Sequence, residues 1–155
     1  MSELFGDASK HLMSVDVMKE DFGWEVPVES VPLPSKGAIY SPDTTLYNRE
    51  TINIKAMTAR EEDILASTAL IKDGSVMTHL LKSCITDRTV DVDSMINGDR
   101  NALMVAIRIT GYGTEYNVRH KCENCAHLNT PTIDLAKLEI KRLKIQPVSD
   151  GENRF

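Results

Sequence analysis

The chain has 155 residues, of which 41% are hydrophobic and 26% charged, as in a globular domain rather than a disordered one. Its 18 basic and 23 acidic residues give a net charge of −5, which argues against a protein that binds mainly nucleic-acid phosphates. No apolar run reaches the length of a membrane span, and the first residues lack the apolar centre of a signal peptide. Three cysteines, an odd number, make a poor disulfide framework, so we expect a reducing, cytoplasm-like compartment.

Residues 1–30 form a predicted acidic N-terminal arm, with seven acidic residues against two lysines. One interpretation is a mobile tail, as is usual for a terminus. The other is an arm that orders on a partner protein, with Phe22 and Trp24 as its anchors. Composition leaves both interpretations open.

The segment 31–37 (VPLPSKG) is predicted to be extended, because its prolines exclude a helix, and Gly37 permits a turn. We expect this segment to contact a partner through Leu33 and Pro34. Residues 51–55 alternate apolar and polar side chains, which predicts a short strand with Ile52 and Ile54 facing the core.

Residues 57–111 carry the pattern of helices. Thr58 and Glu61 form a capping box, which predicts a helix from there to about residue 72 that stops at Gly74. Ser75 is expected to cap a second helix with one apolar face. Cys84 lies on that face, and no base or cation flanks it, so we expect a buried small hydrophobe rather than a reactive thiol.

A third helix is predicted further along this region. Asn97 and Gly98 are expected to break the chain, and Asp99 to cap a helix that ends at Gly111. This helix is apolar on almost every side except at Arg108, which predicts a central buried helix or one in an interface.

Residues 114–135 are predicted to form a β-hairpin with the sequence Cys-Glu-Asn-Cys at its tip. Cys122 and Cys125 have the spacing of zinc ligands, and His120 and His127 stand two residues outside the pair, so all four are candidate ligands for one Zn²⁺. The sequence has no second Cys-x-x-Cys pair. Either the two histidines or another chain supply the two remaining ligands, or the knuckle holds no metal. A redox role is disfavoured, because the pair lies between strands rather than at a helix N-terminus.

The remaining patterns favour a binding protein over an enzyme. The sequence has no phosphate-binding lysine loop, nucleophile elbow or His-Glu-x-x-His pair, and no set of residues combines into a catalytic site. Residues 137–144 hold four basic residues and one acidic residue. Their charge is opposite to that of the acidic arm, which predicts pairing between copies in a homo-oligomer unless both are solvated surfaces.

Several runs of the sequence resemble the baseplate hub proteins of T-even-type contractile-tailed bacteriophages. The resemblance covers about residues 31–135. The family's hairpins usually read Cys-Pro-x-Cys-Gly, whereas Glu123 and Ala126 occupy the Pro and Gly positions here. The runs that carry the resemblance are LPSKG at 33–37, IKAMTAREEDIL at 54–65, LLKSC at 80–84, GDRNAL at 98–103, RITGYG at 108–113, the CENC hairpin and IDL at 133–135.

The resemblance implies a viral protein of the contractile tail, a hub component or a chaperone-like factor for tail assembly around the tape-measure protein. The partners would be other tail and baseplate proteins, in the host cytoplasm during assembly and in the virion baseplate afterwards. We therefore expect an α+β domain at 31–145 with a core of about three helices, a hairpin with a CxxC knuckle, the extended arm, and a C-terminal tail at 146–155. The alternative function is a zinc-knuckle module that binds nucleic acid or a regulatory protein.

Overall fold

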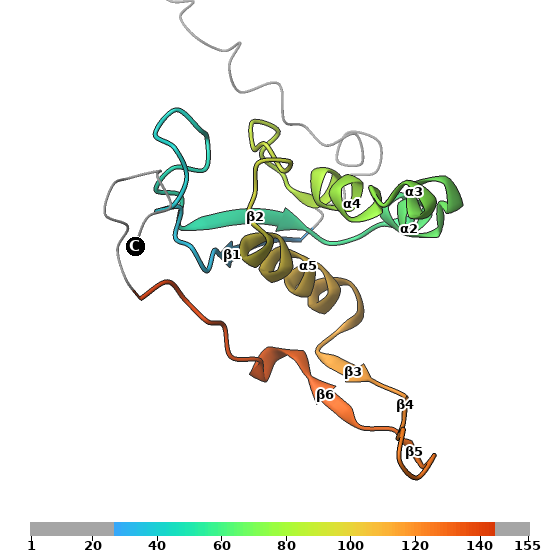
Figure 1. The fold of residues 1–155 in the computed structure, drawn as a ribbon. Coiled ribbons are helices and arrows are strands. Elements are labelled where there is room, and N and C mark those ends of the chain that lie inside the picture. The colour runs from blue at the N-terminus through green and yellow to red at the C-terminus, as the bar shows by residue number, and fades with distance from the viewer. Residues whose placement is uncertain (1–26, 145–155) are drawn as a thin grey trace, which may run out of the picture.

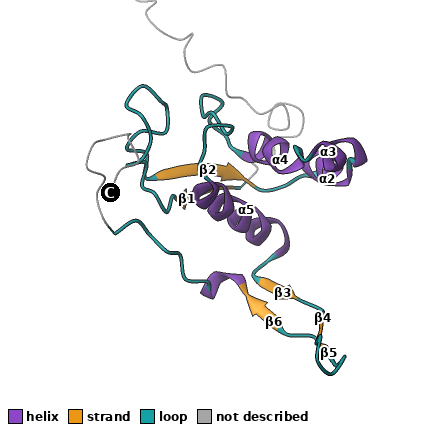
Figure 2. Ribbon diagram, in the orientation of Figure 1, coloured by secondary structure: helices purple, strands orange, loops and turns teal. Residues whose placement is uncertain are grey.

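The structure, a computed structural model, describes residues 27–144 (Figures 1 and 2). Helices combine with small antiparallel strand pairs, which confirms the α+β class. The elements in chain order are β1 (Val28–Pro32), β2 (Thr51–Lys55), α2 (Ala59–Ala66), α3 (Thr68–Asp73), α4 (Val76–Cys84), α5 (Asn97–Tyr112), β3 (Glu115–Asn117), β4 (His120–Lys121), β5 (Leu128–Asn129), β6 (Thr132–Asp134) and the 3₁₀ helix η1 (Leu135–Lys137).

The antiparallel pair β1 and β2 lies at the centre of the molecule, with α5 packed beside it (Figure 1). Val31 pairs with Ile52 in the register of this sheet. Ile52 and Ile54 are both fully buried, as the alternation of residues 51–55 predicts. Because successive side chains of a strand point to opposite faces, this register directs the apolar face of β2 onto the helices.

One hydrophobic cluster joins the sheet, α4, α5 and the loops between them. Burial of this apolar surface is the main favourable contribution to folding. The buried members are Val31, Leu33, Tyr40, Leu46, Ile52, Ile54, Leu80, Leu81, Cys84, Ile85, Val90, Val92, Met95, Leu103 and Ile107.

The helix predicted to run from Thr58 to residue 72 is two helices. The capping box of Thr58 and Glu61 is present at the start of α2, as predicted. Ser67, however, has an extended backbone (φ −68°, ψ 106°) and ends α2, and its hydroxyl accepts the Leu70 N–H at 3.5 Å to begin α3. A serine hydroxyl competes for backbone donors in this way, so the residue acts as a cap between two short helices.

The second predicted helix is present as α4 with Ser75 at its N-cap position, but the Ser75 hydroxyl makes no capping hydrogen bond. Gly74, which ends α3, adopts the left-handed conformation expected of a C-cap glycine, at φ 75°. Cys84 is fully buried, as predicted. Burial, with a smaller contribution from the charge of Glu61, raises the pKa of its thiol to about 11, which keeps it protonated.

Helix α5 begins earlier than the sequence predicts. Ile96 is its N-cap residue, and Asn97 and Gly98 are its first two helical residues rather than a break. The expectation that Asp99 caps the helix is wrong, because its carboxylate is fully buried and bonded to residues of a distant loop. The burial predicted for this helix is found on one side only, because Leu103 and Ile107 are buried while its other apolar residues are half-buried or exposed.

The C-terminal segment leaves η1 as an extended chain without a strand partner up to residue 144. Leu143 donates its N–H to the carbonyl oxygen of Pro34 at 3.2 Å, which ties this segment to the start of the domain. None of the helices between residues 27 and 144 has the length and apolar character needed to cross a bilayer. Most of the acidic arm (1–26) and the tail (146–155) lie outside the described residues, so these domain boundaries stay predictions.

Candidate functional site

The predicted hairpin is present and extends away from the helices and the β1–β2 pair (Figure 1). Strand β3 pairs with β6 near the domain, and β4 pairs with β5 near the tip. Between these pairs, the Val118 N–H donates to the Pro131 carbonyl at 3.0 Å, so the ladder is nearly continuous. The tip of this hairpin, at its end far from α5, carries the Cys-Glu-Asn-Cys sequence (Figure 1).

The base of the hairpin is fixed to the end of α5. The guanidinium of Arg108 lies over the rings of Tyr112 and Tyr116, with 4.8 and 5.8 Å to the ring centroids. The same group donates to the carbonyl oxygen of Gly113 at 3.2 Å. The Arg108 side chain therefore connects α5 to strand β3. Cation–π contacts of this kind contribute about 0.5–1 kcal/mol each at exposed sites.

The turn at the tip brings Cys122 and Cys125 together. The Cys122 N–H donates to the His127 carbonyl and the Ala126 N–H to the Cys122 carbonyl, each at 2.9 Å. Ala126 has a left-handed backbone (φ 57°), a conformation that usually belongs to glycine. Cys125 is exposed and Cys122 is half-buried.

The electrostatics of the turn favour a thiolate. Hydrogen bonds from the backbone N–H groups of Cys125 and then Asn124, followed by the Cys125 thiol, lower the pKa of Cys122 below its usual range. The thiolate is both the nucleophilic and the metal-binding form of cysteine. The tip therefore offers soft sulfur donors at a solvent-exposed position.

The two candidate histidines are not gathered around these sulfurs. His120 lies in β4 opposite Asn129. His127 contacts the turn through its backbone carbonyl oxygen, which accepts the Cys122 N–H. Between residues 27 and 144, no three or more His, Cys, Asp or Glu side chains gather closely enough to hold one metal ion. The structure thus brings together two of the four predicted ligands.

Only two of the four candidate partner-binding residues lie in the described part of the chain. Phe22 and Trp24 lie outside the described residues. Leu33 is 1% exposed and packs in the core, so the structure gives this side chain a packing role in place of the predicted partner contact. Pro34 is half-buried, and its carbonyl oxygen is bonded to Leu143.

The proline-rich segment is held by a buried carboxylate that sequence patterns did not reveal. Asp99 accepts the Ser35 N–H at 3.1 Å, the Ser35 hydroxyl at 2.5 Å and the Tyr40 hydroxyl at 2.7 Å. Burial and the Asp99 hydrogen bond raise the pKa of Tyr40 above its ordinary value. Ser35 is 64 positions from Asp99, so no local pattern could have linked them.

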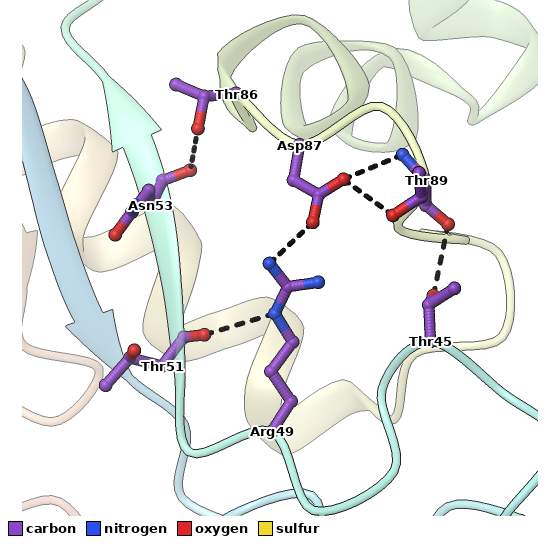
Figure 3. Close-up of polar contacts among 7 residues, drawn as sticks. All are labelled: Thr45, Arg49, Thr51, Asn53, Thr86, Asp87 and Thr89. Atoms are coloured by element: carbon purple, nitrogen blue, oxygen red, sulfur yellow. Dashed lines mark hydrogen bonds and ion pairs between the residues drawn. The ribbon is translucent and has the colours of Figure 1, made fainter. Parts of the chain in front are cut away.

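A second polar cluster fixes the loop between β1 and β2 to the loop after α4 (Figure 3). Arg49 donates to the Asp87 carboxylate at 2.6 Å and to the Thr51 carbonyl at 3.4 Å. Hydrogen bonds from the Thr89 hydroxyl and N–H, with the Arg49 contact, lower the pKa of Asp87 to about 2. Its carboxylate is consequently ionised near neutral pH and acts as a structural acceptor.

The threonines complete this cluster through backbone carbonyls. Thr45 donates to the Thr89 carbonyl at 3.1 Å, and Thr86 donates to the Asn53 carbonyl at 3.2 Å (Figure 3). The cluster therefore joins β2 to two loops, and its members have structural partners.

Comparison with known proteins adds a family to this geometry. The family model described as T4 bacteriophage base plate protein matches residues 30–153, which is most of the chain. Neither the curated proteins nor the solved structures give a significant match.

Proposed function

Because the chain belongs to the T4 bacteriophage base plate protein family, we propose that it acts without catalysis in assembling the central hub of the tail baseplate. Its partners would be the hub proteins and the tape-measure protein. It would meet them in the host cytoplasm, either as a subunit that remains in the virion or as a chaperone-like factor that leaves. Family membership is the observation that carries this proposal.

Support comes from the surfaces that the fold leaves exposed. The hairpin exposes Tyr116, Leu128 and Ile133, and the extended segment after it exposes Leu138 and Ile140, each by at least 39%. Exposed apolar side chains on segments that stand off the core are typical of binding surfaces. A protein that joins other subunits needs such surfaces rather than a cavity.

Support also comes from what the buried acids do. Glu61 and Asp99 are fully buried, and both carboxylates accept hydrogen bonds that hold elements of the fold together. Groups with strongly altered environments are the first candidates for catalysis. Here their contacts explain them as structural, which favours a non-enzymatic role.

A genetic experiment tests the role in assembly. Host cells would be infected with phage that lacks this gene, with or without the wild-type chain supplied from a plasmid. We expect complete tails and infectious particles only when the chain is supplied. Normal particle yield without the chain would contradict the proposal.

The two forms of the proposal differ in the finished particle. Quantitative mass spectrometry of purified virions would find the chain at a fixed ratio to other baseplate proteins if it is a hub subunit. It would find the chain in assembly intermediates but not in virions if it is a chaperone-like factor.

Partner binding can be measured directly with the tagged chain co-expressed with the hub and tape-measure proteins of the same phage. Trp24→Ala is expected to reduce recovery of these partners if the acidic arm is the binding element, as is the double substitution of Leu138 and Ile140 to Asp if the extended segment contributes. Asp63→Asn, an exposed change on α2, is the control and should leave recovery unchanged. Undiminished binding by both test variants would assign binding to another surface, with the hairpin the next to be tested.

A further inference from the structure

The hairpin tip holds two thiols, those of Cys122 and Cys125, on one tight turn. Cys122 and Cys125 stand three positions apart on this turn, so both thiols lie at the tip of the hairpin. The turn is closed on both sides by backbone hydrogen bonds of 2.9 Å. Such a turn keeps the pair assembled before any ion arrives, which lowers the entropic cost of binding.

The ion that suits this donor set is Zn²⁺. Zinc binds thiolates at about 2.3 Å and takes four ligands in a structural site. One hairpin brings two of these ligands together. The tip lies at the far end of the hairpin from the helices, and Cys125 is exposed, so donors of a second molecule can approach it (Figure 1).

We propose that two copies of this chain meet tip to tip and bind one Zn²⁺ through Cys122 and Cys125 of each copy. A twofold arrangement makes the contact self-complementary, since each copy contributes the same pair of thiolates. It needs no donor beyond the two that the structure already brings together.

The charge around the tip suits this assembly. Four thiolates and one Zn²⁺ carry a net charge of −2. Arg119 and Lys121 are exposed and lie within three residues of Cys122 in each copy, where their positive charge offsets that of the centre. Leu128 lies opposite Lys121 and is 56% exposed, so a tip-to-tip contact would also cover apolar surface.

The proposal is independent of the role in baseplate assembly, because it depends only on the hairpin. The test is native mass spectrometry of the full-length chain in a non-chelating reductant, titrated with zinc chloride. We expect dimers that hold one zinc ion and that return to metal-free monomers when a strong chelator is added. Cys122→Ser and Cys125→Ser should each abolish both zinc binding and the dimer.

Substitution of both His120 and His127 to Ala is the matched control and should leave the zinc dimer intact. Replacement of zinc by Co²⁺ reports the ligands independently, since a tetrahedral thiolate site gives sulfur-to-cobalt charge-transfer absorption. One zinc ion on a monomer, lost in the histidine variant, would overturn the proposal in favour of a site within one chain. Absence of zinc binding by the reduced wild-type chain, or a zinc dimer that survives loss of the cysteines, would also overturn it.

Discussion

At the scale of single residues, this fold depends on a few positions with demanding local geometry. Gly37 has φ 74° and lies against the loop that returns to β2, where an added Cβ would be 2.2 Å from the backbone nitrogen of Arg49. Gly74 has nearly the same backbone angle, φ 75°, but nothing lies within 4 Å of its Cβ position. A comparison of the two glycines therefore separates the cost of a left-handed backbone, which both positions would have, from the cost of steric overlap, which only Gly37 would have.

This difference predicts unequal effects of alanine at the two positions. Gly74→Ala should lower the free energy of unfolding by about 1 kcal/mol, the cost of a left-handed alanine. Gly37→Ala should cost roughly 3 kcal/mol or more, because the Arg49 backbone must also move. Urea denaturation followed by circular dichroism measures both, and equal midpoints for the two variants would contradict the explanation.

Asp99 provides the second prediction at this scale. Asp99→Asn keeps the shape of the side chain but replaces one acceptor oxygen with a donor that faces the donors of Ser35 and Tyr40. We expect a loss of about 2–3 kcal/mol in the free energy of unfolding, as for a buried polar group left without a suitable partner. Tyr40→Phe removes a single hydroxyl and should cost about 1 kcal/mol, so the reverse order of stability would contradict this role for Asp99.

At the scale of elements, Glu61 connects three of them. Its carboxylate accepts the Thr58 N–H at 2.9 Å at the start of α2 and the Ser83 hydroxyl at 2.6 Å in α4, and it lies 3.4 Å from the Lys55 ammonium of β2. Burial alone would raise the pKa of this acid. The hydrogen bonds from Ser83 and Thr58, with the charge of Lys55, outweigh burial and lower the pKa to about 2.

This lowered pKa predicts how stability responds to acid. The pKa of Glu61 is about 2 in the folded state against an ordinary 4.5, so its contribution is present above pH 4.5 and is lost as the pH falls toward 2. That contribution is on the order of 3 kcal/mol. Glu61→Gln should therefore flatten the fall in unfolding free energy between pH 4.5 and 2, measured by urea titrations at each pH.

The control for this experiment is Asp63→Asn, which changes an exposed carboxylate on the same helix. Its acid dependence should match that of the wild-type chain. An unchanged pH dependence in Glu61→Gln would show that Glu61 does not carry the acid sensitivity.

At the scale of the whole molecule, charge separates the baseplate role from the alternative of nucleic-acid binding. The net charge is −5, while basic residues such as Arg119 and Lys121 are exposed on the hairpin. We expect no retention of double-stranded DNA or single-stranded RNA in filter binding at low salt, because the overall charge repels phosphates. Retention that falls steeply as salt rises would instead support the nucleic-acid module.

The sequence alone determined the parts of this protein that depend on neighbouring residues. The capping box at Thr58, the left-handed Gly74, the alternation of β2 and the cysteine hairpin are all local patterns. They correctly predicted where a helix begins, where a helix ends, which face of β2 is buried and where a hairpin forms. The family followed from longer runs of the same kind and is confirmed by the match over residues 30–153. Local patterns predict local structure because backbone sterics and hydrogen bonds act over a few residues.

Only the tertiary structure decided what distant residues do to one another. Asp99 is a residue type that often caps helices, but its carboxylate accepts a hydrogen bond from Ser35, 64 positions away. Helix α5 begins before it, at Asn97. Leu33 is predicted to contact a partner because it lies in a proline-rich segment, yet its side chain is buried in the hydrophobic cluster. His120 and His127 are close to Cys122 in sequence, but within residues 27–144 they do not join the two cysteines in a group that could hold a metal ion. Burial and the pairing of polar groups are set by the whole fold, so they can be read only once the chain is folded.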